Sequence, residues 1–240
     1  TMFFAYFKRG LLAGGVAGIA YGLFMATVAN PLVGYLEHAQ HGHSHAPDGG
    51  SVVAESTTAL VSVGGGLLWA LFLGGCFGIA LYFVEPALPG RGAAKGFVLA
   101  ASGFLTISVT PWLVLPPFAP GAEQALGTDI RFALYAGLVA LGGLIAASSV
   151  LAYNRVEPRS RALAVVAGAT PVVVAVVVLP LVSPTLVSHP ELSADLVAAY
   201  RAMIVLSQGS IWMLIAATFG WLQRRNGVET TVSETAGTTT

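Results

Sequence analysis

Long apolar runs, separated by short polar segments, dominate the chain. A helix that crosses a bilayer needs about 20 predominantly apolar residues. Six runs meet this requirement, namely residues 10–29, 60–84, 96–116, 132–152, 162–182 and 202–222. Asp, Glu, Lys, Arg and His are absent within these runs. The pattern therefore predicts an all-α, polytopic membrane protein with six transmembrane helices.

Glycines and prolines add detail to the predicted helices. Glycine is frequent in the first, second and fourth runs, where small residues would allow membrane helices to pack closely. Six prolines lie in the helices or at their ends: Pro31, Pro86, Pro111, Pro116, Pro171 and Pro180. Each removes a backbone N–H and leaves a carbonyl free, which inside a membrane must be satisfied by protein or by a water-filled cavity.

Hydroxyl and amide side chains accompany these prolines. Thr110 and Thr170 each precede a proline, and Ser207 and Gln208 lie in the middle of the sixth run. One interpretation is a polar track through the third, fifth and sixth helices that a hydrated cation could use. The other is a set of ordinary kinks, in which Ser and Thr bond to carbonyls of their own helix.

The composition agrees with a membrane protein. Hydrophobic residues make up 55% of the chain and charged residues 9%, whereas soluble domains carry about 25% charged residues. So few charges cannot cover a soluble globule, and the lipid bilayer is the expected surrounding. The 11 basic and 11 acidic residues balance, so no nucleic acid is expected as a partner.

The positions of the basic residues predict the orientation, because short cytoplasmic loops of membrane proteins are enriched in Lys and Arg. Nine of the 11 basic residues lie on one side: Lys8, Arg9, Arg91, Lys95, Arg155, Arg159, Arg161, Arg224 and Arg225. That side is predicted to be the cytoplasm, with both termini inside the cell. The other side carries all five histidines and seven acids: Glu37, Asp48, Glu55, Glu123, Asp129, Glu191 and Asp195.

The longest polar segment, a predicted extracytoplasmic loop at residues 30–58, concentrates histidine. Four of the five histidines lie between Glu37 and Asp48: His38, His41, His43 and His45. Neutral imidazole is a common ligand of borderline divalent metals, and the flanking acids supply the negative charge that these ions favour. If the loop is extended, His41, His43 and His45 lie on one side of it, because they alternate along the chain. If the first helix continues outward, His38, His41 and His45 share one helix face. Both arrangements predict a metal site; the alternative is a solvated polar loop.

A further histidine lies in the last loop on the same side. His189 is followed by Glu191 and Asp195, and His189 could join the histidine-rich loop as an additional metal ligand. A single histidine in a loop is more often solvated than ligating, so simple solvation is the alternative.

Motifs typical of enzymes are missing from the sequence. It has no G-x-x-x-x-G-K-[ST] phosphate loop, no H-E-x-x-H and no G-x-S-x-G, so no enzymatic activity is expected. No ionisable residue lies inside the predicted helices to form a proton relay. No tightly bound cofactor is expected, and a divalent metal would be cargo.

The chain is expected to divide into two parts. Residues 1–226 would form the six-helix transmembrane domain. Residues 227–240 are rich in threonine, carry Glu229 and Glu234 and show no apolar period. Such a segment cannot bury enough apolar surface to fold alone, and it is predicted to be a disordered cytoplasmic tail.

Four stretches together resemble the CbtA family, the proposed cobalt transporter subunits. They are FKRGLLAGGVAG at 7–18, the histidine-rich insert at 38–45, PWLVLPPFAPG at 111–121 with Arg131 and Tyr135, and PEL at 190–192 with Gln208 and Trp212. The resemblance covers nearly the whole chain except the tail. It implies a multi-pass subunit for cobalt uptake beside a small single-span partner, CbtB, that also carries histidine.

The sequence therefore predicts a membrane subunit for uptake of a divalent transition metal, with cobalt first and nickel second. The histidine-rich loop would capture the ion, and the proline-broken helices would pass it on. The alternative is a non-transporting accessory or metal-sensing subunit that binds metal for a partner transporter. A homo-oligomer is also compatible with the sequence.

Overall fold

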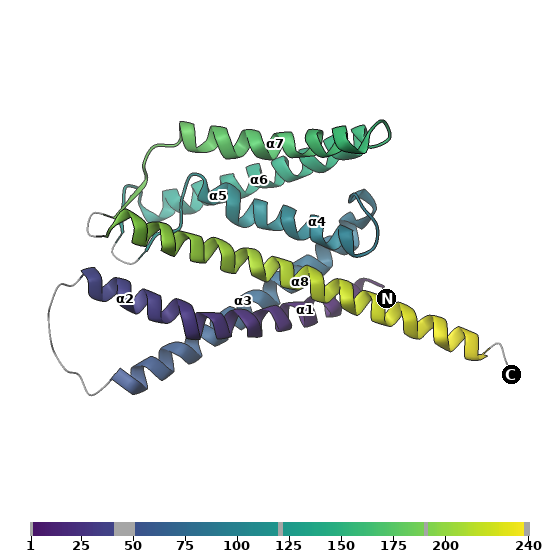
Figure 1. Cartoon of the computed structure of the whole chain (residues 1–240), viewed down its shortest axis with the longest axis horizontal. Helices are drawn as coiled ribbons and strands as arrows, with labels where there is room; N and C mark the ends of the chain where they lie inside the picture. The colour runs from purple at the N-terminus through teal and green to yellow at the C-terminus, as the bar shows by residue number, and fades with distance from the viewer. Residues whose placement is uncertain (1, 41–50, 120–121, 190–191, 238–240) are drawn as a thin grey trace.

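Six long helices make up the described part of the protein. The computed structural model describes the backbone of residues 2–40, 51–119, 122–189 and 192–237, with side chains for residues 2–36, 57, 60–119, 122–189 and 192–225. Six helices are long and apolar enough to cross a membrane: Met2–Leu36, Leu60–Ala87, Ala93–Trp112, Thr128–Val156, Arg161–Val182 and Ala194–Arg225. The predicted all-helical architecture with six spans is confirmed (Figure 1).

The first two spans extend beyond the predicted boundaries. The first comprises α1 (Met2–Phe24), the π-helical turn η1 (Met25–Ala29) and α2 (Asn30–Gln40). The second comprises α3 (Ser51–Val84) and the 3₁₀ turn η2 (Glu85–Ala87). Both helices therefore continue into the segment 30–58, which the sequence predicts to be a loop. Extending an existing helix adds one hydrogen bond per residue fixed, so polar residues are added at little cost.

The third span is interrupted, and the last three are continuous helices. The third consists of α4 (Ala93–Phe104), the π-helical turn η3 (Leu105–Val109) and the short α5 (Thr110–Trp112). The others are α6 (Thr128–Val156), α7 (Arg161–Val182) and α8 (Ala194–Gly237). The backbone of α8 is helical through most of the segment predicted to be a disordered tail. The division of the chain at residue 226 stays a prediction.

The first and third spans each contain a π-helical turn that ends two residues before a proline, Pro31 in the first and Pro111 in the third. η1 ends at Ala29 and η3 ends at Val109. A proline inside a helix cannot donate to the carbonyl four residues earlier, and its ring crowds that carbonyl. The wider π-turn shifts the hydrogen-bond register just before each proline, so both helices bend there and do not end.

The core lies where α3, α1, α8 and α4 meet. Its largest fully buried side chains include Phe77 and Leu73 of α3 and Phe219, Ile211 and Ile215 of α8. The helices α1 and α3 are in close contact through glycines, since a Cβ on Gly74 would lie 2.7 Å from the Cα of Gly14. Close approach through glycine is the packing expected between membrane helices.

The helices α6 and α7 form a second layer beside this core (Figure 1). Here α7 packs mainly along α6, and α6 contacts the third span at η3. The outward face of α7 exposes a row of valines, including Val166, Val173 and Val177. So much exposed apolar surface is compatible with a lipid surrounding and not with water. The protein is thus a multi-pass membrane protein.

The two ends of the bundle differ in charge. The first turns of α1, the last turns of α8 and the 88–92 and 157–160 turns lie at one end, shown on the right in Figure 1. The nine clustered basic residues belong to these segments or to the helix turns beside them. At the other end lie the last turns of α2 and a two-stranded antiparallel ribbon, β1 (Glu123–Gln124) and β2 (Val187–Ser188). Which end faces the cytoplasm stays a prediction.

Candidate functional site

The structure describes only part of the predicted metal-binding loop. The backbone of Glu37 and His38 belongs to α2, which continues to Gln40. The remaining three histidines of the loop and Asp48 lie in residues 41–50, outside the described residues. The helical backbone at His38 fits the arrangement in which the first helix continues outward. How the four imidazoles group around a metal stays a prediction.

His189 takes part in a defined hydrogen bond. The backbone N–H of Ala119 donates to its Nε2 at 3.0 Å, so this nitrogen carries no proton and its lone pair is occupied. Partial burial, together with the positive charge of Arg201, lowers the pKa of His189 from its ordinary value of 6.5. The ring is therefore held neutral, and a metal could bind Nε2 only by displacing the Ala119 N–H.

The described residues do not assemble a metal site around His189. In the ranges whose side chains are described, no three His, Cys, Asp or Glu side chains lie close enough together to hold an ion. Asp195 is an exposed residue in the first turn of α8, and Glu191 falls outside the described residues. A metal-binding role for His189 would thus need ligands from the histidine-rich loop, and it stays a prediction.

At the end of the bundle opposite the basic residues, the connection between α5 and α6 is held against the connection between α7 and α8. The ribbon pairs Glu123 with Ser188 and Gln124 with Val187. The guanidinium Nε of Arg201 donates to the carbonyl of Pro117 at 3.2 Å. With the bond between His189 and Ala119, these contacts hold the proline-rich segment against the start of α8. Sequence patterns could not reveal the ribbon, because two-residue strands leave no periodic signal.

A tyrosine compensates for the proline in the third span. Pro111 has no N–H for the carbonyl of Ile107, four residues earlier. The hydroxyl of Tyr135 in α6 donates to that carbonyl at 2.9 Å. The freed acceptor is thus satisfied by a protein group. This bond fastens α6 to the π-turn of the third span.

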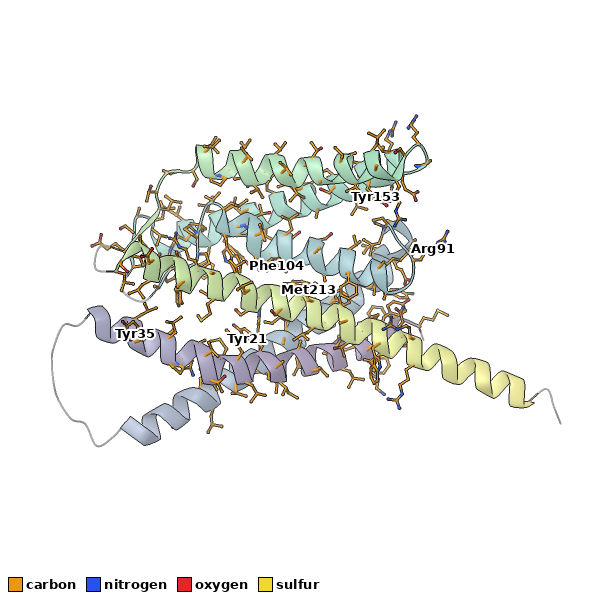
Figure 2. The ribbon with its side chains drawn as sticks, viewed as in Figure 1. Tyr21, Tyr35, Arg91, Phe104, Tyr153 and Met213 are labelled. Carbon is orange, nitrogen blue, oxygen red and sulfur yellow. The ribbon has the colours of Figure 1, made fainter. Side chains whose placement is uncertain are left out.

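A polar cluster lies at the edge of the core, between three helices. Gln208 of α8 donates through Nε2 to the hydroxyl of Tyr21 in α1 at 3.2 Å, and its Oε1 accepts from the indole N–H of Trp69 in α3 at 3.5 Å. Figure 2 shows Tyr21 between α1 and α8. Gln208 was predicted to contribute to a track through the third, fifth and sixth helices, but its contacts are with the first and second.

The other residues of the predicted polar track differ in whether their hydroxyl groups have a hydrogen-bond partner. Thr170 donates to the carbonyl of Val166 at 2.8 Å, and Ser207 donates to that of Ile204 at 2.9 Å, which is the ordinary bonding within one helix. Thr110, in contrast, is fully buried, and its hydroxyl oxygen has no partner among the described residues. The hydroxyl oxygen of Ser149 in α6 is also buried without one.

A cavity of about 590 Å³ lies between the third span, α6 and α7. Its walls include Leu105 and Val109 of η3, Ser149 of α6, and Gly168 and Val172 of α7. Two of the predicted proline-broken helices, the third and the fifth, therefore face a common space. The described residues that line this cavity include none from α8.

Comparison with known proteins gives one family. The family model described as "Probable cobalt transporter subunit (CbtA)" matches residues 3–224. No curated protein and no solved structure matches the chain. The family is one of transporter subunits and not an enzyme class. Because the match spans all six membrane-crossing helices, the chain belongs to the CbtA family of probable cobalt transporter subunits.

Proposed function

We propose that this protein takes up a divalent transition metal across the membrane, with Co²⁺ as the principal cargo and Ni²⁺ as the second. The observation that carries the proposal is the family match over residues 3–224. Four histidines between the first two membrane-spanning helices agree with it, since borderline divalent metals favour imidazole. Intrinsic affinities would place nickel above cobalt, so selectivity for cobalt would depend on geometry or supply.

The histidine-rich loop is proposed to capture the ion on the extracytoplasmic side. His38, His41, His43 and His45 would be the principal ligands, with carboxylates from Glu37 and Asp48 and a further imidazole from His189. Capture would weaken below about pH 6, because protonated imidazole cannot ligate. An inside-negative potential would then favour entry by about 4.6 kcal/mol per 100 mV for a doubly charged ion.

The route proposed for the ion runs among the proline-broken helices. Its support is the cavity shared by the third span, α6 and α7, whose wall includes the buried Ser149 hydroxyl oxygen that has no partner among the described residues. The Thr110 hydroxyl oxygen, also without a described partner, lies outside this wall and faces Gly142 of α6. Such oxygens could accept an ion that has lost part of its water shell. The sequence predicted a route among the third, fifth and sixth membrane helices. In this proposal α6, which is the fourth membrane helix, takes the place of α8, the sixth, as the third wall of the route.

The family description as a subunit implies a partner. We propose a small single-span protein of the CbtB type in that role, because a subunit of six helices would share its membrane surface with its partner. Purification of the chain together with a tagged single-span protein from the same cells would test this. Separation of the two in mild detergent would contradict it.

The alternative proposal is a non-transporting accessory or metal-sensing subunit. It is supported by the tight packing of α1 on α3, where a Cβ on Gly14 would lie 3.0 Å from the Cα of Leu71, so no ion could pass between these two helices. An accessory subunit would bind metal through the loop and leave transport to its partner.

Uptake of radioactive cobalt by whole cells tests the proposal. Cells that produce the chain, with and without the single-span partner, are compared with cells that produce a variant with His38, His41, His43 and His45 changed to Ala. We expect the variant to lose uptake at low cobalt and to recover it at high cobalt. Uptake that is the same with and without the chain would contradict a transport role and favour the accessory subunit.

A further inference from the structure

A second cavity, of about 510 Å³, lies at the end of the bundle that carries the ribbon. It is lined mainly by apolar side chains, among them Trp112, Pro116, Phe118 and Phe132, and it is closed on one side by Leu186 of the segment that leads into β2. It shares no lining residue with the cavity between the third span, α6 and α7. The proposed metal route therefore makes no use of it.

Two polar groups in the wall of this cavity are buried without a partner. The Nε of Arg131, a donor, and the Oε1 of Gln124, an acceptor, have no hydrogen-bond partner among the described residues. A buried polar group without a partner costs free energy, more so when it is charged. A ligand that offered an acceptor to Arg131 and a donor to Gln124 would satisfy both.

The charge of Arg131 is not neutralised within the described part of the chain. Arg131 forms no ion pair there, and the acids nearest in sequence, Glu123 and Asp129, are exposed. An isolated guanidinium beside an apolar cavity attracts an anion, and its planar donors match phosphate oxygens. The same charge disfavours a bare divalent cation at this position.

The position of the cavity relative to the ends of the membrane spans indicates which kind of anion it could bind. Its walls include Trp112, the last residue of the third membrane span, and Thr128, the first residue of the fourth. The cavity thus lies at the boundary between the apolar part of the bilayer and its headgroups. Phe118 and Phe132, both exposed, belong to its lining. A molecule with an acyl chain and an anionic headgroup fits this position.

We propose that this cavity is a binding site for an anionic phospholipid with a hydroxyl-bearing headgroup, such as phosphatidylglycerol. The phosphate would accept from the Arg131 guanidinium, a headgroup hydroxyl would donate to Gln124, and an acyl chain would lie against Trp112 and Phe132. The site holds the ribbon and the third span against α6 and needs no metal.

Quenching of tryptophan fluorescence by brominated lipids tests the site. The protein is placed in vesicles with equal fractions of brominated phosphatidylglycerol or brominated phosphatidylcholine, and the contribution of Trp112 is taken as the difference between the parent and Trp112→Phe. One arginine near a membrane surface contributes about 1 kcal/mol, so we expect about a fivefold preference for phosphatidylglycerol. Arg131→Gln should abolish the preference, and Arg131→Lys should keep it.

Matched controls separate the possible results. Arg91→Gln, which removes an exposed arginine at the opposite end, should leave the preference unchanged. Equal quenching by both lipids in the parent, or an unchanged preference in Arg131→Gln, would overturn the proposal. Loss of the preference on adding inorganic phosphate would assign the site to a free phosphate and would also overturn it. Because none of these measurements includes a metal, they are independent of cobalt uptake.

Discussion

A single side chain compensates for the hydrogen bond that Pro111 removes from the third membrane span. Pro111 lies within the third span, where a free carbonyl would have no water to bond to. Tyr135, one helix further along the chain, supplies the missing donor to Ile107. Sequence reasoning identified Pro111 and Tyr135 separately, but not their pairing, because no pattern shows which residue of α6 faces which carbonyl of the third span.

Removal of the Tyr135 hydroxyl should destabilise the protein only while Pro111 is present. We expect Tyr135→Phe to lower the free energy of unfolding in detergent by about 1 kcal/mol. In a Pro111→Ala background the new backbone N–H serves the Ile107 carbonyl, so the same change should cost close to nothing. The exposed Tyr35 provides a control as Tyr35→Phe. Equal costs in both backgrounds would contradict the assigned role.

Protonation of His189 should loosen the end of the bundle that carries the ribbon. Its pKa is lowered in the folded protein, so the unfolded chain binds a proton more readily than the folded one. The stability it contributes is complete above its ordinary pKa of 6.5 and is lost as the pH falls below that value. Unfolding midpoints measured between about pH 7.5 and pH 5 should fall more for the parent than for His189→Asn, which cannot titrate. The same pH dependence in both would contradict this.

At the scale of elements, the pattern of apolar runs predicted the number and order of the helices. Their ends were less predictable. The first helix begins at Met2 and reaches Gln40, because the π-turn at Met25–Ala29 lets it continue past Pro31. Pro31 signals a disturbance of the helix in the sequence, but not that a π-turn lets the helix continue. The sequence also did not predict which helices pack against each other, because helices that are apolar on all sides carry no pattern that marks the face in contact with a neighbour.

The glycine contact between α1 and α3 should tolerate no side chain. Gly74→Ala would place a Cβ 2.7 Å from the Cα of Gly14, and we expect a loss of about 1–3 kcal/mol in unfolding free energy. Gly65, in the same helix, has open space around it, so Gly65→Ala should be neutral or stabilising by about 0.5–1 kcal/mol. Thermal unfolding of both variants in detergent measures the difference. Equal effects would contradict the close packing.

At the scale of the whole molecule, the charge asymmetry predicts which end faces the cytoplasm. With Cys76 replaced by Ala, cysteines are introduced at Thr185, near the ribbon, or at Arg159, in the opposite turn. A maleimide that cannot cross membranes should label Thr185→Cys in intact cells and Arg159→Cys only after the cells are opened. The reverse result would place the histidine-rich loop in the cytoplasm and exclude capture from outside.

The candidate metal site could be predicted only in its ligand types. The residues His38 to His45 stand out by their density, and the family match agrees with a metal as cargo. Their arrangement could not be predicted, because no apolar period specifies it, and residues 41–50 lie outside the described residues. The lipid site at Arg131 could not be predicted at all, since Gln124, Trp112 and Arg131 come together only through the fold.

The most direct test of metal uptake is the flux of radioactive cobalt into proteoliposomes under an inside-negative potential. The parent, alone and with the proposed single-span partner, is compared with the variant that lacks His38, His41, His43 and His45. We expect uptake that follows the potential, is lost in the variant at low cobalt and returns at high cobalt. Cobalt that binds to the parent but never enters the vesicles, with or without the partner, would contradict a transport function.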